Sequence, residues 1–189
     1  MVMAARDRLI DSAIALLQRN GVAGTGISEL LAHSRVARRS VYLNFPGGKA
    51  ELVADAARTA GQAASGMIRR LLAEADAVTA VEAFIAVWKD ALIGSDFRAG
   101  CPIVAAALGR SEAPDAADVA GAVFADWERL LTGRLEEADV EPETAQQLAT
   151  TTVAAVEGAV IMSLAAKSVA PLQRTGQLLK GLVAQHTRP

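Results

Sequence analysis

The sequence is poor in the residues that build disulfide frameworks, metal sites and aromatic clusters. Its 189 residues include one cysteine, two histidines and only 4% aromatic residues. One cysteine, Cys101, excludes an internal disulfide, and together with two distant histidines it cannot supply the usual four zinc ligands. We therefore expect no metal and no cofactor, and a reducing cytoplasm as the location.

Long uncharged apolar runs and β-branched runs are also missing. The nearest approach to a membrane-spanning run, residues 148–166, contains Glu157 and four hydroxyl residues. A bilayer needs about 20 predominantly apolar residues, so we expect no membrane association. Alanine and leucine are common instead, and their helical spacing predicts an all-α fold.

The two ends of the chain differ in charge. Residues 1–50 carry seven Lys or Arg against three Asp or Glu, a net charge of +4, whereas residues 51–189 carry −6. A cationic segment on an acidic body indicates that only this segment meets a polyanion such as DNA. Chance clustering of the charges is the alternative interpretation.

Apolar periodicity and helix-ending residues divide the chain into helical segments. Thr25 is expected to cap a second helix of about two turns, and Pro46 with two glycines ends the third. The remaining helices are expected at 5–19, 37–44, 49–72, 77–92, 101–108, 113–137, 143–167 and 171–185.

The second and third of these segments predict a DNA-reading motif. Two short helices joined by a tight turn, with arginines and hydroxyls on the second, have the shape that places one helix in the major groove. Arg38 and Arg39 are the candidates for reading base edges. Contacts to DNA, largely to phosphates, are expected from polar groups nearby: Thr25, Ser28, Ser40, Tyr42, Asn44 and Lys49.

The sequence of this segment resembles that of the DNA-binding head of the TetR family of transcriptional regulators. The resemblance covers roughly residues 5–53 and rests on three runs: Thr25-Gly26-Ile27, Glu29-Leu30-Leu31, and Ser40-Val41-Tyr42-Leu43-Asn44-Phe45-Pro46-Gly47-Gly48-Lys49-Ala50-Glu51-Leu52. Residues 45–49 and 100–103 are similar to the LmrA-like branch. Two positions depart from the family pattern: Arg35 stands where a turn glycine is usual, and Ala37 where a capping Ser or Thr is common.

The resemblance implies a helix-turn-helix DNA-binding domain at residues 1–50 and a helical ligand-binding and dimerisation domain at 51–189. Small residues along 143–167 permit close helix approach, and the last helix carries Leu172, Leu179, Leu182 and Val183. We expect the last two long helices to pair with their symmetry mates in a homodimer. Packing of these residues within one chain is the alternative.

Large side chains scattered through the alanine-rich body are candidates for binding an apolar effector. These are Met67, Phe84, Trp88, Cys101, Phe124, Trp127 and Met162. Glu157 joins them as the one charge between Gln147 and Lys167, either orienting a ligand, capping the dimer interface or facing water. Each large residue has a plain core role as its alternative, and Cys101 is expected to be a buried thiol rather than a redox sensor.

We therefore expect a ligand-responsive repressor of a palindromic operator, and the resemblance implies that a small apolar ligand releases it from DNA. A small helical enzyme is the first alternative, but the chain has no nucleophile beside a base, and Gly47-Gly48-Lys49 lacks the spacing of a phosphate loop. The second alternative is a constitutive architectural DNA binder, which would bind no ligand.

Overall fold

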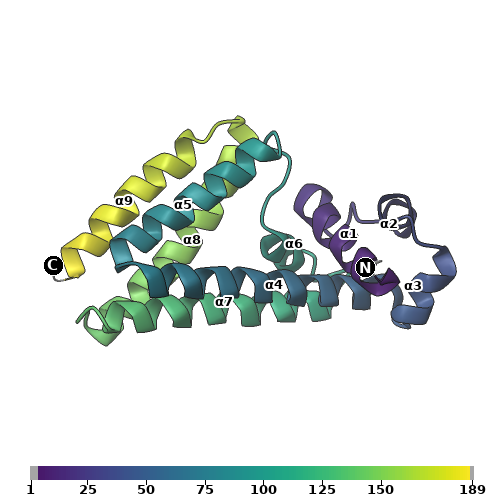
Figure 1. Ribbon diagram of the computed structural model, residues 1–189, viewed down its shortest axis with the longest axis horizontal. Helices are drawn as coiled ribbons and strands as arrows, with labels where there is room; N and C mark the ends of the chain where they lie inside the picture. Colours follow the sequence, from purple (N-terminus) through teal and green to yellow (C-terminus); the bar gives the residue numbers. More distant parts are fainter. Residues whose placement is uncertain (1–3, 188–189) are drawn as a thin grey trace. The chain divides into compact units, whose positions relative to one another are not determined.

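The computed structural model describes residues 4–187, which form nine α-helices and no strand (Figure 1). The all-α prediction is confirmed, and each helix end expected from the sequence agrees to within two residues. The helices are α1 (Ala5–Asn20), α2 (Ile27–Ser34), α3 (Arg38–Asn44), α4 (Gly48–Glu74), α5 (Ala77–Gly94), α6 (Pro102–Leu108), α7 (Pro114–Glu136), α8 (Pro142–Ala166) and α9 (Ala170–His186).

Local chemistry explains where these helices start and stop. Gly21 follows α1 with a φ of 67°, a conformation that costs glycine little. Asp76 caps α5 by accepting a hydrogen bond from the Thr79 amide, and Pro142 opens α8, where a missing N–H is no loss. Short-range sequence signals therefore set the helix ends.

Contacts divide the chain into two compact units. The head unit comprises residues 1–63 and 101–123, and the body unit comprises residues 64–100 and 124–189. The helices α4 and α7 each contribute residues to both units. The boundary that we expect after residue 50, between a DNA-binding and a ligand-binding domain, stays a prediction.

The head unit is built around α1. Leu9, Ala13 and Leu17 on α1 are buried, and α1 contacts α2, α3 and α6, as Figure 1 shows. The approach near α6 is very close, because a Cβ added at Gly109 would lie 2.3 Å from Cγ2 of Val22. A glycine is therefore required where the end of α6 meets the segment after α1.

The body unit centres on α5, α8 and α9, which contact one another in all three pairs (Figure 1). The prediction that Leu172, Leu179 and Val183 face a partner subunit is wrong, because all three are buried in this unit's own core. Their apolar period on α9 is satisfied by α5 and α8 of the same chain, which is the alternative that the sequence left open.

The helix α8 also has the composition of a membrane span. An 18-residue window of it reaches a mean hydropathy of 1.6, and 44% of that window is buried inside the fold. Core helices of soluble proteins share this composition, so one such helix is weak evidence for a membrane.

Candidate DNA-binding surface and ligand cavity

The turn between α2 and α3 holds a left-handed arginine. Arg35 has φ 54° and ψ 36°, the region in which a residue with a Cβ loses about 1–2 kcal/mol relative to glycine. Val36 is buried beside it, and Ala37 is the N-cap of α3 without a side-chain hydrogen bond. The turn therefore has the family's glycine-type geometry, and α3 lacks the cap that a Ser or Thr would supply.

The helix α3 presents arginines outward on an apolar anchor. Val41 and the following Phe45 are fully buried, whereas Arg38 and Arg39 are exposed. Leu43 is 68% exposed, and the sequence analysis did not single it out. Its position two residues after buried Val41, about 200° around the helix, was the available signal. The outer face of α3 therefore combines two cations with an apolar side chain.

A cation–π contact and an ion pair connect the end of α3 with α1 and α4 in the head unit. The Arg6 guanidinium lies 5.3 Å from the centroid of the Phe45 ring and pairs with Asp55 on α4. At the start of α4, the Glu51 carboxylate accepts a hydrogen bond of 2.7 Å from the Gly47 amide. Gly48 has a φ of 67°, so the two glycines after Pro46 allow the abrupt change from α3 to α4.

A cavity lies within the body unit. Its volume is about 40 Å³. On the same scale, a cavity that holds one water molecule has a volume of about 10–15 Å³. Four helices line it, with these residues: Ile68, Leu71 and Leu72 of α4, Ala80, Val81 and Phe84 of α5, Trp127 and Leu131 of α7, and Thr152, Val153, Val156 and Glu157 of α8. The wall is mostly apolar, with three residues that carry polar groups.

Two family descriptions match the chain, one up to the first turns of α4 and one from α5 onward. "Bacterial regulatory proteins, tetR family" matches residues 9–56, and "Transcriptional regulator LmrA/YxaF-like, C-terminal domain" matches residues 77–178, more than half of the chain. The chain belongs to the TetR family of transcriptional regulators. The expected resemblance to the LmrA-like branch is confirmed by the second match.

Relatives and solved structures agree with this assignment. The chain is 31% identical to the HTH-type transcriptional regulator Rv0196 of Mycobacterium tuberculosis, over 94% of this chain and 93% of that protein. It is 23% identical to the HTH-type transcriptional regulator LmrA of Bacillus subtilis, over 94% and 96% of the two chains. Regulatory protein TetR from Rhodobacter sphaeroides has the same fold, with a TM-score of 0.86, 18% identity and coverage of 97% and 99%. Proteins of the TetR family are regulators that bind DNA and dimerise, not enzymes.

Several predicted DNA contacts of this TetR-family chain already have partners inside the head unit. The Asn44 amide donates a 2.7 Å hydrogen bond to the Ser40 carbonyl, and Lys49 Nζ lies 3.1 Å from Glu112 Oε2. Ser28 and Tyr42 are exposed, and Ser40 is half-buried. The exposed pair presents its groups to solvent, whereas Lys49 must exchange one carboxylate for a phosphate to contact DNA.

Thr25 does not cap α2, contrary to the prediction. Its side chain is fully buried, and its hydroxyl donates a 2.6 Å hydrogen bond to the Gly21 carbonyl. The N-cap is Gly26, whose amide donates to the Glu29 carboxylate at 3.0 Å. The hydroxyl turns back to the preceding turn because the chain bends there before the helix begins.

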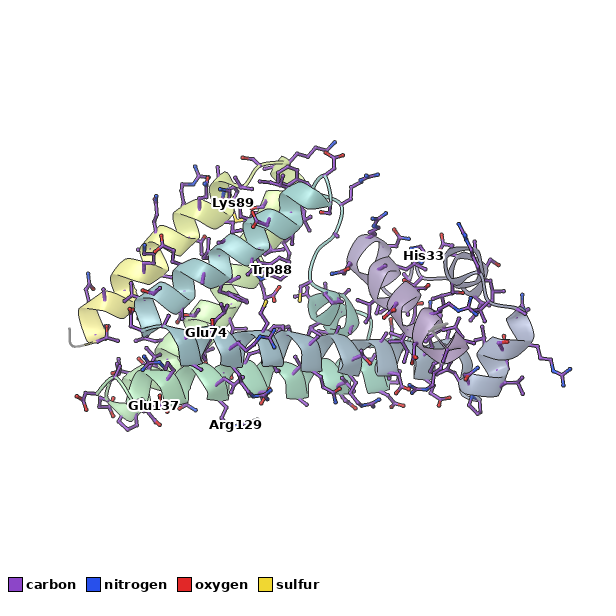
Figure 2. The ribbon with its side chains drawn as sticks, viewed as in Figure 1. His33, Glu74, Trp88, Lys89, Arg129 and Glu137 are labelled. Atoms are coloured by element: carbon purple, nitrogen blue, oxygen red, sulfur yellow. The ribbon has the colours of Figure 1, made fainter. Side chains whose placement is uncertain are left out.

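Three of the eight predicted ligand residues line the cavity: Phe84, Trp127 and Glu157. The other five lie outside the lining, and a ligand contact by any of the eight stays a prediction. Trp88 is half-buried on α5 (Figure 2), Met67 and Phe124 are half-buried, Met162 is exposed, and Cys101 is buried at the N-cap of α6 in the head unit. Size alone did not separate cavity from core, because a cavity depends on how four helices pack.

Proposed function

We propose that this TetR-family chain is a cytoplasmic repressor whose homodimer binds a palindromic operator and releases it when a small apolar ligand enters the body cavity. The observation that carries the proposal is the outer face of α3, where Arg38 and Arg39 are exposed on a helix anchored by Val41 and Phe45. Exposed cations on a rigid short helix are what groove binding requires.

DNA recognition begins with α3 in the major groove. A groove about 12 Å wide admits a helix, and arginines near its N-terminal end reach the O6 and N7 acceptors of guanine. Ser28 and Tyr42 have free access to the phosphates on either side. Two copies of α3 must stand about 34–36 Å apart to read both halves of a palindrome, so the function needs a dimer.

The dimer interface that we propose uses the outer faces of α8 and α9. Exposed apolar side chains gather there: Ile161 is 50% exposed, Met162 60% and Leu178 73%. Gly158 and Gly181 lie on the same helices with open space at their Cβ positions, which permits close approach of another helix. Burying these side chains against a second copy removes apolar surface from water.

Ligand response is assigned to α4. This helix lines the cavity with Ile68, Leu71 and Leu72, and its first turns, from Lys49 to Asp55, belong to the head unit. A ligand that favours a different position of α4 in the cavity wall weakens DNA binding by its differential affinity for the two states.

Operator titration of single variants tests the DNA-binding surface. An inverted repeat beside the coding region supplies the operator candidate. Arg38→Ala and Arg39→Ala should each lower operator affinity at fixed salt by about 10- to 100-fold, the size of one base contact. Arg110→Ala is the matched control, because Arg110 is an exposed cation of the head unit that pairs with Asp118. Unchanged affinity in both α3 variants would remove the recognition-helix assignment.

Sedimentation measurements test the interface separately. Met162→Glu and Leu178→Glu should convert the dimer to monomer at micromolar concentration, because each places a charge in a buried apolar contact. Ile93→Glu is the control, since Ile93 is 52% exposed on α5. A dimer that survives both substitutions must use another surface.

A further inference from the structure

Trp127 lines the cavity, and its indole N–H is buried without a hydrogen-bond acceptor in the described part of the chain. Trp127 is 4% exposed, and its Nε1 has no acceptor among residues 4–187. A buried donor without an acceptor is unfavourable, and native proteins satisfy nearly all such groups. Because Trp127 lines the cavity, a molecule occupying the cavity is the available source of the missing acceptor.

The position of the Trp127 ring is fixed by its neighbour. The ring of Phe124 meets it edge to face, with the centroids 5.4 Å apart and the planes at 84°. This geometry is favourable for aromatic pairs and opposes rotation of the indole. The Trp127 ring is therefore held on one side by an aromatic contact within α7.

The other polar groups of the wall lie on α8. Thr152 and Glu157 are 7% and 8% exposed, respectively, and both line the cavity. They lie more than one helical turn apart on α8. A carboxylate there accepts a hydrogen bond from a ligand hydroxyl. The buried, mostly apolar wall disfavours an anionic ligand, because a charge loses its hydration there.

The size of the cavity limits the ligand. A volume of about 40 Å³ corresponds to a few water molecules, so a ring enters only if lining side chains move. Leu71, Leu72 and Phe84 are half-buried rather than fully buried, and these are the side chains able to make room.

We propose that the effector is a small uncharged molecule, one apolar ring bearing a hydroxyl. The hydroxyl oxygen accepts a hydrogen bond from Trp127 Nε1, and the hydroxyl group donates a hydrogen bond to the Glu157 side chain. This inference rests on the proposed function, in which the cavity holds the effector. It goes further by requiring oxygen on the ligand, so a hydrocarbon of the same shape is a poor effector.

The test compares three ring compounds of matched shape by calorimetry: p-cresol, p-xylene and p-toluate. In the native dimer p-cresol should bind about 3- to 10-fold more tightly than p-xylene, the range of one hydrogen bond, and p-toluate should bind most weakly. In Trp127→Phe the ratio of p-cresol to p-xylene affinity should fall, because the indole donor is lost. In the control Trp88→Phe it should not change, because Trp88 lies outside the lining.

A second readout uses the native sequence. The chain has two tryptophans, so the indole N–H resonances are assigned by Trp88→Phe. Saturating p-cresol should move the Trp127 resonance downfield, as a new hydrogen bond does, and p-xylene should not. Equal affinities for p-cresol and p-xylene, absence of p-cresol binding, or an unmoved Trp127 resonance would each overturn the proposal.

Failure here is distinguishable from failure of the repressor proposal. Operator release by p-xylene as effective as release by p-cresol leaves the repressor standing and removes the oxygen requirement. If neither the Arg38 nor the Arg39 variant loses operator affinity, the recognition-surface assignment is wrong. The ring compounds are measured without DNA, so their binding is judged independently of that result.

Discussion

The candidate DNA surface and the cavity are built in opposite ways. The surface is one seven-residue helix, contiguous in sequence and exposed, with Arg38 and Arg39 facing solvent. The cavity is assembled from α4, α5, α7 and α8 and is buried and mostly apolar. The DNA surface depends on which residues occupy one short segment, whereas the cavity depends on how helices distant in sequence pack together. Substitutions that act on charge should therefore affect the head unit's function, whereas those that act on packing should affect stability in either unit.

The largest effect on stability that we predict is at Gly109, where the end of α6 meets the segment after α1 in the head unit. Gly109→Ala places a Cβ 2.3 Å from Cγ2 of Val22, a β-branched and buried side chain that cannot rotate away. Overpacking of this kind costs about 1–3 kcal/mol of unfolding free energy, measured by denaturant titration. Gly121→Ala is the control, because it has open space and should stabilise its helix by about 0.5–1 kcal/mol. Equal effects of the two substitutions would show that the contact is looser than described.

The corresponding contact of the body unit should be more tolerant. At Gly176 on α9 an added Cβ would lie 2.8 Å from Cγ1 of Ile85, which is half-buried and has room to adjust. We expect Gly176→Ala to cost about 1 kcal/mol, the lower end of overpacking effects, in the same titration. Gly133→Ala on α7 of the same unit has nothing within 4 Å and should stabilise instead. A greater loss at Gly176 than at Gly109 would reverse this ranking of the units.

The same contrast explains what the sequence predicted and what it did not. Helix ends follow from local signals such as Pro102 and Pro142, and the exposure of Arg38 and Arg39 follows from the apolar anchor beside them. The cavity was found only in part, because Trp127 and Trp88 have the same residue type and differ only in packing. The prediction that the apolar residues of α9 face a partner subunit was wrong for a related reason. An apolar stripe on α9 does not specify whether it packs against the same chain or against a second copy.

Stability and DNA affinity should move in opposite directions at the turn before α3. Arg35→Gly relieves the left-handed strain, so we expect the unfolding free energy to rise by up to about 1 kcal/mol. The same substitution removes an exposed cation from the head unit, so operator affinity should fall modestly and depend less steeply on salt. The measurements are denaturant titration and operator titration at several salt concentrations.

Arg35→Asn separates the two effects, since asparagine tolerates this conformation but carries no charge. It should share the loss of salt dependence with Arg35→Gly and show less of the gain in stability. An unchanged salt slope in both variants would place Arg35 away from the phosphates.

The smallest effect that we predict concerns acid sensitivity, and it belongs to the body unit. Hydrogen bonds from the Thr79 amide and hydroxyl hold the pKa of Asp76 below its ordinary value of 3.8, and the amides of Thr144 and Glu143 hold the pKa of Glu141 below 4.5. A carboxyl whose pKa is lower in the folded state stabilises the fold above its unfolded-state pKa, and this stabilisation is lost as pH falls through the folded-state pKa. The double variant Asp76→Asn/Glu141→Gln should therefore lose less stability than the native chain when the pH is lowered from about 5 to 3.

The substituted side chains still carry oxygens that accept these hydrogen bonds but lose the ionised carboxylates, so the double variant should be modestly less stable than the native chain at neutral pH. The measurement is the denaturant midpoint at about pH 7, 5, 4 and 3, with Asp90→Asn as the control that removes an exposed carboxylate of α5. In the head unit the N-caps of α2 and α3 are Gly26 and Ala37, which carry no ionisable group. Acid should therefore loosen the starts of α5 and α8 before that of α3, which amide exchange measured residue by residue at pH 4 would detect. A native-like pH slope in the double variant would mean that the acid sensitivity resides in other carboxylates.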